Sequence, residues 1–388
     1  MKKLTAVLLL TIVSFCVPLM AQDARCPWQD PGVNQINREP MRAHFIPYIN
    51  EDAALRQSAM PDAERFALNP ETERRISLDG TWKFLYSRNN AECPEDFYRT
   101  GYNTRRWDDI EVPGSWELQG FDAPIYTDTR YPFPPDPPYV PGDYNPVGAY
   151  VREFTLPRGW EDMDVFLDFE GVESAFYCWV NGEFAGYSED SRLPAHFNVT
   201  GLLKKGKNTL AVKVFRYSDG SYLEGQDYWR YSGIERSVYL YARPQSRVED
   251  FLLSAPLVHD YRDGDFALRL LLHGAQAGQK VMVKVIDPQG NVILSEDRTL
   301  SGPADTVMTV SRMFSDVLPW NAETPNLYTL TVSLSDSRGQ SLEAFAHPFG
   351  FRTVEMWNGQ VLVNGVPVLF KGVNRHEHSP ETGRTITV

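Results

Sequence analysis

Short segments in which apolar and polar residues alternate, each followed by turn residues, make up most of this 388-residue chain. A period of two is typical of strands with one buried face. Asn181-Gly182 separates two such segments, and this dipeptide favours a two-residue hairpin turn because both residues tolerate positive φ. The expected strands cover residues 149–156, 164–169, 175–180, 209–216 and 236–241. The pattern predicts a mainly β fold, with a jelly-roll sandwich over residues 76–244.

A second set of alternating segments follows residue 245. Val281, Val283 and Val285 fall on one face of an expected strand, and a proline- and glycine-containing turn brings the chain back in the next strand. The pattern predicts an immunoglobulin-like β-sandwich over residues 245–352. This stretch contains no titratable cluster typical of an active site, so we interpret the second sandwich as a spacer.

Residues 353–388 contain two more turn dipeptides, Asn358-Gly359 and Asn364-Gly365. Apolar residues then dominate from Val366 to Val373, as in a strand that is buried on both faces. Asn374-Arg-His-Glu-His378 follows with no apolar residue. We therefore expect a buried strand that ends at a functional surface, with alternate residues of the polar run on one side of it.

The amino-terminal residues 1–21 are organised like a secretion signal. Lys2 and Lys3 precede an apolar core, and Ala21 provides a small residue at the expected cleavage point. We therefore expect a periplasmic or secreted protein, with no membrane insertion after the signal is removed. Residues 22–75 are irregular and rich in turn residues, which indicates an arm that lies on a neighbouring surface.

The charge and the cysteines limit the possible partners. A formal net charge of −13 argues against nucleic acid and against an anionic membrane surface, because both would repel the protein. Cys26, Cys93 and Cys178 remain after removal of the signal, and this odd number allows at most one internal disulfide, whose pairing stays open. Cys178 alternates with Phe176 and Val180, so we expect it to be a small buried apolar side chain.

Two loops of the first sandwich are candidate binding loops. The proline-rich residues 122–148 cannot form a central strand, and a loop of this length in a compact domain is usually functional. Asn145 lies near its exit. In residues 186–194, Glu189 and Asp190 precede Arg192, which allows either a solvated ion pair or a polar site.

Several motifs resemble those of family 2 glycoside hydrolases, in particular the large β-galactosidases. The amino-terminal Pro31-Gly-Val33 and Gln35-Ile-Asn-Arg38 are also similar to the arm of those enzymes. The main matching motifs are Asn364-Gly-Val-Pro-Val-Leu-Phe-Lys-Gly-Val-Asn-Arg-His-Glu-His378, Asp190-Ser-Arg-Leu-Pro194, Trp320-Asn-Ala-Glu-Thr-Pro-Asn-Leu-Tyr328 and Phe349-Gly-Phe-Arg352.

The resemblance implies that residues 353–388 begin a catalytic (β/α)8 barrel. It also implies retaining hydrolysis of terminal β-galactosides by two glutamates about 5 Å apart. In the family both glutamates lie on later barrel strands, so we expect none among these 388 residues and no turnover by this chain alone.

The resemblance also assigns site residues. Asn145, Asp190 and His376 are expected to contact the sugar, and Asp190 is also expected to bind Na⁺. A carboxylate suits both roles, because it is a hard oxygen ligand and a double acceptor for vicinal hydroxyls. The family also uses Mg²⁺, with most of its ligands expected beyond this chain. The expected assembly is a homo-oligomer.

Two other functions fit parts of the sequence. The first is a non-catalytic secreted carbohydrate-binding module, in which the jelly roll acts as a lectin. The second is a metal-dependent barrel hydrolase that uses the His-x-His pair His376 and His378. In residues 218–234, Glu224 and Asp227 could be mistaken for a glycosidase carboxylate pair, but the sequence does not fix their separation.

Overall fold

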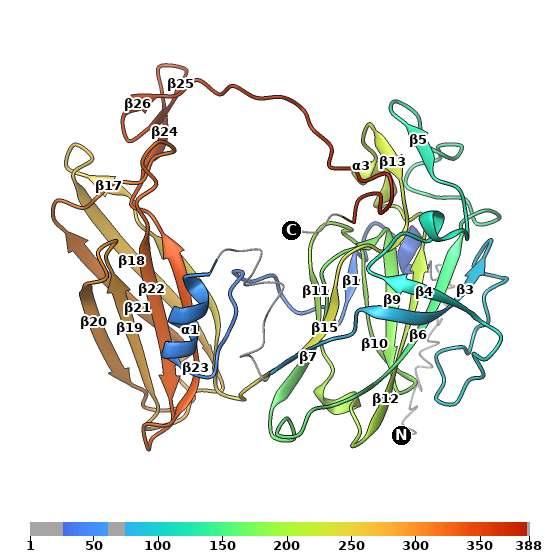
Figure 1. Ribbon diagram of the computed structural model, residues 1–388, viewed down its shortest axis with the longest axis horizontal. Helices are drawn as coiled ribbons and strands as arrows, with labels where there is room; N and C mark the ends of the chain where they lie inside the picture. The colour runs from blue at the N-terminus through green and yellow to red at the C-terminus, as the bar shows by residue number, and fades with distance from the viewer. Residues whose placement is uncertain (1–25, 61–73, 386–388) are drawn as a thin grey trace, which may run out of the picture.

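The computed structural model describes residues 26–60 and 74–385, so the expected signal segment lies outside the described residues. The described residues form two β-domains, and the last described segment passes from the second domain back to the first (Figure 1). The mainly β fold predicted from the sequence is confirmed.

The first domain is a sandwich of a seven-stranded and a four-stranded antiparallel sheet. Its strands are β1 (Gln35–Ile36), β2 (Arg75–Ser77), β3 (Gly80–Ser87), β4 (Asp108–Val112), β6 (Val147–Thr155), β7 (Asp164–Phe169), β9 (Ala175–Val180), β10 (Glu183–Ser188), β11 (Ala195–Asn198), β12 (Lys207–Phe215) and β15 (Val238–Arg243). The sheets have the orders β1-β10-β9-β12-β6-β3-β4 and β11-β7-β15-β2. All five strands expected from the sequence are present, within two residues at each end.

Short elements connect these strands at one end of the sandwich. β5 (Ile125–Thr127) pairs with β13 (Tyr228–Arg230), and β8 (Val172–Glu173) pairs with β14 (Gly233–Ile234). The helical elements of this domain are the 3₁₀ turns η1 (Pro27–Gln29), η2 (Trp116–Gln119) and η3 (Thr200–Leu202) and the short helix α3 (Ser221–Glu224).

Aromatic and branched side chains from both sheets fill the space between them. Trp82, Phe84 and Tyr150 from the larger sheet meet Leu167 and Phe169 from β7, and all five are at most 1% exposed. Burial of this apolar surface is the main force that holds the two sheets together.

The outer face of the seven-stranded sheet is covered as well. Trp28, Phe97 and Phe133 come from the arm and from two loops, and they pack on Val147 and Ala149 of β6. The start of β6 is therefore buried on both faces, which explains its unbroken apolar run.

The second domain is also a two-sheet sandwich, as the sequence predicts. Its strands are β16 (Arg247–Ser254), β17 (Leu257–Val258), β18 (Asp263–His273), β19 (Lys280–Ile286), β20 (Val292–Thr299), β21 (Val307–Phe314), β22 (Tyr328–Ser335) and β23 (Ser341–Phe349). One sheet has the order β16-β18-β17, with β21 also paired to β18, and the other has the order β20-β19-β22-β23. Val281, Val283 and Val285 are all fully buried, as their alternation predicts.

Two tight turns join the three-stranded sheet that follows, which consists of β24 (Val354–Trp357), β25 (Gln360–Val363) and β26 (Val366–Pro367). Both residues of Asn358-Gly359 have positive φ, at 47° and 74°, and those of Asn364-Gly365 have φ of 51° and 74°. The two-residue hairpin turns predicted from these dipeptides are confirmed.

The predicted buried strand from Val366 to Val373 is wrong for this structure. β26 ends at Pro367, and Leu369, Phe370 and Val373 are 80%, 74% and 90% exposed. A barrel strand is buried when neighbouring strands pair with it and helices cover it, whereas β26 pairs only with β25 among the described residues. The predicted alternation of Asn374, His376 and His378 along a strand is therefore absent.

The amino-terminal arm crosses both domains. β1 extends the edge of the larger sheet by pairing with β10, and Phe45 enters the core of the second domain. Tyr48 forms a β-bridge with Ala344 of β23, and α1 (Glu51–Ser58) then packs on the same strand (Figure 1). The expectation that the arm lies on a neighbouring surface is confirmed for its described part.

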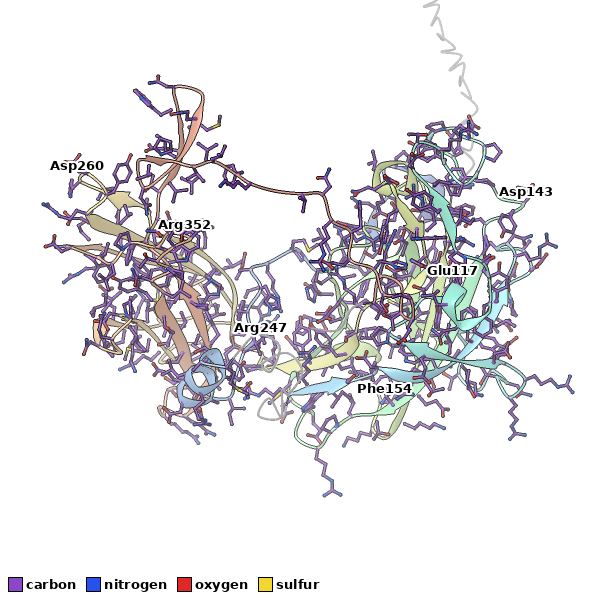
Figure 2. The ribbon with its side chains drawn as sticks, turned by 45° about the horizontal axis from the view of Figure 1, so that its top comes forward. Glu117, Asp143, Phe154, Arg247, Asp260 and Arg352 are labelled. Atoms are coloured by element: carbon purple, nitrogen blue, oxygen red, sulfur yellow. The ribbon has the colours of Figure 1, made fainter. Side chains whose placement is uncertain are left out.

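Buried ion pairs lie where the two domains meet. Arg243 at the end of β15 donates to both carboxylate oxygens of Glu343 in β23, at 2.8 and 3.3 Å. Arg247, which lies between the domains in Figure 2, forms an ion pair of 2.6 Å with Asp164 of β7. Both arginines are less than 5% exposed, so these contacts belong to the interior.

The three described cysteines are free thiols. Cys26 is exposed, whereas Cys93 and Cys178 are buried, and Phe176 and Val180 share the core with Cys178 as predicted. In the part of the chain that the structure describes, no helix is both long and apolar enough to cross a membrane.

Candidate functional site

The segment from residue 374 to 385, here called the crossing segment, lies on the first domain beside β13 (Figure 1). The imidazole of His376 stacks on the ring of Tyr228, with centroids 4.9 Å apart and an interplanar angle of 23°. His378 Nε2 lies 2.9 Å from the hydroxyl of Tyr231. The two histidines singled out in the sequence therefore meet the aromatic residues around β13.

An arginine from each of two loops holds a buried pair of acids. Arg384 of the crossing segment forms ion pairs with Glu173 and Glu235 and donates to the carbonyl of Trp229 at 2.7 Å. Arg192 contacts the same two carboxylates, at 2.5 and 3.0 Å. The 186–194 loop and the crossing segment are thus joined through Glu173 and Glu235.

Burial shifts the titration of this acid pair. The pKa of Glu235 is raised to about 8, mainly by loss of hydration and then by the neighbouring Glu173 carboxylate, while Arg192 opposes the shift. The pKa of Glu173 is raised by burial too. The two arginines offset part of the cost of burying two like charges, so this end of the domain depends on both of them.

Asp190 lies on the loop that Arg192 anchors. Its backbone has a φ of 75°, in the left-handed region, and its side chain is exposed. The next residue, Ser191, donates its N–H and its hydroxyl to Glu224, at 2.8 and 2.7 Å. Among the described residues the Asp190 carboxylate accepts no hydrogen bond and has no ion-pair partner within 4 Å. A held backbone with a free carboxylate is suited to binding a hydroxylated ligand or a hard cation.

The arm lies beside this loop. Arg38 donates to the Ser188 hydroxyl at 2.9 Å and to the carbonyl of Glu189 at 3.2 Å. Burial lowers the pKa of Arg38, while the nearby carboxylates of Asp190 and Glu189 raise it. The arm therefore brings a positive charge close to Asp190.

Asn145 is buried and links two segments of backbone. It is 1% exposed, its side-chain oxygen accepts from the N–H of Tyr217 at 2.9 Å, and its amide donates to the carbonyl of Tyr217 at 2.8 Å. These two bonds tie the proline-rich loop to the end of β12. The amide keeps one further donor and one further acceptor site, but the side chain is buried, whereas Asp190 and His376 are exposed. The sugar contact expected for Asn145 stays a prediction.

Exposed aromatic residues lie at the tip of the β5–β13 pair, and one of them, Trp229, belongs to the aromatic-rich residues 218–234. The rings of Tyr126 and Trp229 lie 5.5 Å apart and are 54% and 37% exposed. The Tyr126 hydroxyl donates to Asp227, and Tyr228 donates to the carbonyl of Glu377. Aromatic rings beside exposed carboxylates can bind both the apolar face and the hydroxyls of a pyranose. The sequence places Tyr126 and Trp229 about a hundred residues apart, so only the strand pairing reveals this site.

The acids of residues 218–234 have separate roles. Glu224 is bound to Ser191, and Asp227 accepts from Tyr126, so neither is a free carboxylate opposite the other. The geometry gives no support to a glycosidase carboxylate pair formed by these two residues.

The side chains that could act as metal ligands limit which metal ions the site can bind. Within residues 26–60 and 74–385 no group of three or more His, Cys, Asp or Glu side chains is arranged to hold a metal ion. His376 and His378 contact Tyr228 and Tyr231, and the metal-dependent hydrolase alternative stays a prediction. The free carboxylate of Asp190 fits a cation such as Na⁺, which takes oxygen ligands.

Three sequence-family models match this chain in succession. They are described as the sugar-binding domain, the family 2 domain and the TIM-barrel domain of glycosyl hydrolases family 2, and they match residues 76–244, 246–352 and 354–388. The chain belongs to glycosyl hydrolase family 2. The fold and order of the two sandwiches agree with this assignment.

Curated relatives that match this family 2 chain are named β-galactosidases. The protein from Priestia megaterium is 38% identical over 92% of this chain, and the protein from Photobacterium profundum is 42% identical over 81% of it. These matches cover 34% and 31% of the two relatives. The chain thus spans about a third of the length of the relatives it matches.

Solved structures share the fold at lower identity. A β-glucuronidase from Bacteroides uniformis superposes with a TM-score of 0.67 at 22% identity, over 81% of this chain and 36% of that protein. A β-glucuronidase from Bifidobacterium dentium, in complex with coumarin-3-O-glucuronide, gives a TM-score of 0.65 at 23% identity, over 80% of this chain and 54% of that protein.

Proposed function

We propose that this chain is the sugar-facing amino-terminal part of a β-galactosidase that removes terminal β-galactose with retention of configuration. The observation that carries this proposal is the identity of 38–42% to proteins named β-galactosidase across most of the chain. The meeting of the Asp190 loop with the crossing segment supports it, because two predicted sugar-contacting residues then lie at one end of the first domain.

Within this proposal Asp190 and His376 contact the galactose. The exposed carboxylate of Asp190 accepts from two neighbouring hydroxyls, and the imidazole of His376, held against Tyr228, exchanges a hydrogen bond with another. Asp190 also supplies one oxygen ligand to Na⁺, which would fix the orientation of the carboxylate. Asn145 acts indirectly, by holding the proline-rich loop to Tyr217.

Retaining hydrolysis needs an acid/base and a nucleophile about 5 Å apart. We propose that both are glutamates on later strands of the barrel, together with most ligands of a Mg²⁺ ion. The 388-residue chain alone should therefore hydrolyse no β-galactoside. The mature protein is exported to the periplasm or the medium and assembles as a homo-oligomer.

The test begins with the coding DNA beyond the codon for Val388 and the expression of the whole open reading frame. The full-length protein should hydrolyse o-nitrophenyl β-galactoside and should not hydrolyse the matching β-glucuronide. Asp190→Asn should raise KM and remove the dependence of KM on Na⁺, because the amide carries no charge. The control Asp265→Asn, which changes an exposed acid on β18 of the second domain, should leave both properties unchanged.

Three results would contradict the proposal. A preference for the glucuronide would refute the substrate assignment. Turnover by the purified 388-residue chain would refute the placement of the catalytic glutamates. A stop codon directly after Val388, together with tight galactose binding by the chain, would favour the non-catalytic carbohydrate-binding module.

A further inference from the structure

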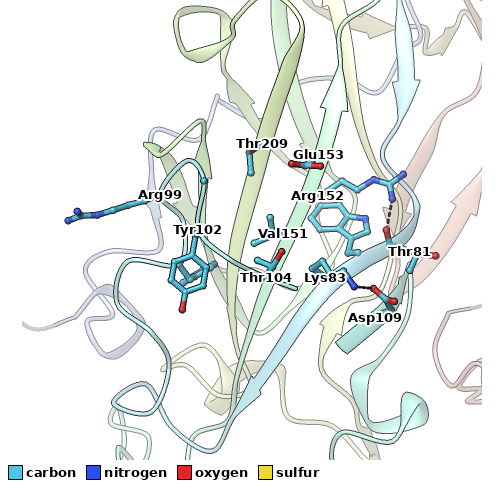
Figure 3. A pocket seen from close by; sticks show the side chains of 13 residues that line it. Thr81, Lys83, Arg99, Tyr102, Thr104, Asp109, Val151, Arg152, Glu153 and Thr209 are labelled. Carbon is cyan, nitrogen blue, oxygen red and sulfur yellow. Dashed lines mark hydrogen bonds and ion pairs between the residues drawn. The ribbon is translucent and has the colours of Figure 1, made fainter. Parts of the chain in front are cut away.

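A cleft of about 380 Å³ lies on the outer face of the first domain (Figure 3). Its base is formed by β3, β6 and β12, which contribute Lys83, Val151 and Thr209. Tyr102 and Thr104, from the loop between β3 and β4, form the opposite wall. The volume lies within the range of about 300–1,000 Å³ typical of small-molecule sites.

The loop that forms this wall is anchored at several points. Phe97 is 1% exposed in the outer apolar layer, and Trp107 packs near Tyr102 with ring centroids 5.8 Å apart. Between them, the Thr100 hydroxyl donates to the carbonyl of Asn181 at 2.9 Å. The cleft is therefore preformed, so a ligand would not have to order the loop.

The charges that line the cleft nearly balance one another. Arg152 donates to the backbone carbonyls of Thr81 and Asp79 and has no ion-pair partner among the described residues. Lys83 forms an ion pair of 2.7 Å with Asp109, and Glu153 forms one of 2.7 Å with Lys207. Arg99 has no ion-pair partner among the described residues, and its side chain extends away from the cleft in Figure 3. The cleft thus has little net charge to offer a free phosphate or a metal ion.

Hydroxyl groups, in contrast, are left without partners. Among the described residues the side-chain hydroxyls of Tyr102, Thr104 and Thr209 form no hydrogen bond. They surround an apolar patch made by Val151 and the Tyr102 ring. A preformed cleft with an apolar patch, free hydroxyls and nearly balanced charges matches a neutral polyhydroxylated ligand better than an ion.

We propose that this cleft is a second, non-catalytic carbohydrate site that binds one or two neutral pyranose units. The Tyr102 ring packs against the C–H face of the sugar, and the three free hydroxyls and the Lys83–Asp109 pair exchange hydrogen bonds with its hydroxyl groups. None of its lining residues belongs to the Asp190 loop or to the crossing segment. The proposal therefore does not depend on β-galactosidase activity.

The test uses the 388-residue chain, with lactose as a neutral probe and inorganic phosphate as an anionic one. Binding is followed by saturation-transfer NMR and calorimetry in the Asp190→Ala background, which disables the other candidate site. Tyr102→Ala should weaken lactose binding at least about tenfold, which corresponds to 1.4 kcal/mol. The matched control Tyr261→Ala, a tyrosine of the second domain that lies outside the cleft, should bind as the parent does.

A second variant keeps the test valid if Tyr102→Ala disturbs the loop. Thr104→Val removes one hydroxyl at constant shape and should also weaken lactose binding, with an unchanged circular dichroism spectrum. The proposal is overturned if the Asp190→Ala chain binds no lactose, if its lactose binding survives Tyr102→Ala and Thr104→Val, or if phosphate binds in the cleft and lactose does not.

Discussion

The ion pair between Arg243 and Glu343 joins the two sandwich domains, and its removal should be costly. Besides its two contacts with Glu343, Arg243 donates to the carbonyl of Val248 at 2.6 Å. Glu343 in turn accepts from the N–H of Val248 at 2.7 Å. Arg243→Met deletes the cation and leaves a carboxylate that is 2% exposed without a charged partner.

The expected loss of stability follows from the burial of the Arg243–Glu343 pair. Breaking a buried pair by removing one partner typically costs about 3–5 kcal/mol, because the remaining charge stays in the interior. Adding Glu343→Gln to Arg243→Met removes that charge but keeps an oxygen that can accept from Val248. The double variant should then lose only about 1–2 kcal/mol, the usual cost of a missing hydrogen bond and an unpaired carbonyl.

Urea unfolding of the full chain at neutral pH measures this difference. Far-ultraviolet circular dichroism gives the free energy of unfolding for the parent, the two single variants and the double variant. The second substitution should restore about 2 kcal/mol to the Arg243→Met protein, since a buried charge is removed. A double variant as unstable as Arg243→Met would refute the reasoning, because the cost would then come from lost packing.

Three further predictions concern other parts of the molecule. Burial raises the pKa of Glu117 from 4.5 to about 7, so folding takes up a proton between these pH values. The free energy of unfolding should therefore fall by about 3 kcal/mol as the pH rises from 4.5 to 7. Urea unfolding at several pH values should show a smaller fall for Glu117→Gln. Asp260 lies on an exposed turn with a φ of 58°, a backbone conformation that strains residues other than glycine. Asp260→Gly should therefore raise the free energy of unfolding by about 0.5–1 kcal/mol in thermal unfolding, and a lower stability would contradict strain at this residue. Arg384→Met leaves Glu173 with Arg192 alone, so amides of the crossing segment should exchange hydrogen faster, and unchanged exchange would argue against its anchoring role.

The sequence predicted those parts of the fold whose cause is local. Asn-Gly turns and period-two alternation act over a few residues, so β19 and the hairpins of residues 354–367 were found correctly. The exposed run from Leu369 to Val373 was predicted as a buried strand, because burial of a strand depends on partners that the run itself does not specify.

The candidate site could likewise be predicted only in part, because its contacts join residues far apart in sequence. Asp190 was found through a motif, and the structure shows its carboxylate free. Asn145 was assigned to the site through the family resemblance, and nothing in the sequence showed that its amide is bonded to Tyr217, 72 residues later. Arg384 gave no signal at all, since its partners Glu173 and Glu235 are far away in sequence and are recognised only in the fold.

The amino-terminal arm has a consequence for the timing of synthesis. Tyr48 can form its bridge only after Ala344 has been made, about 300 residues later, which takes roughly 15–60 s at the usual ~5–20 residues per second. β1 stays unpaired until β10 has been made, about 150 residues after it, and Phe45 lacks Phe345 for almost the whole interval. Phe45 and Tyr48 are thus made early but reach their final contacts late, and a chaperone that binds extended apolar segments would find its target there.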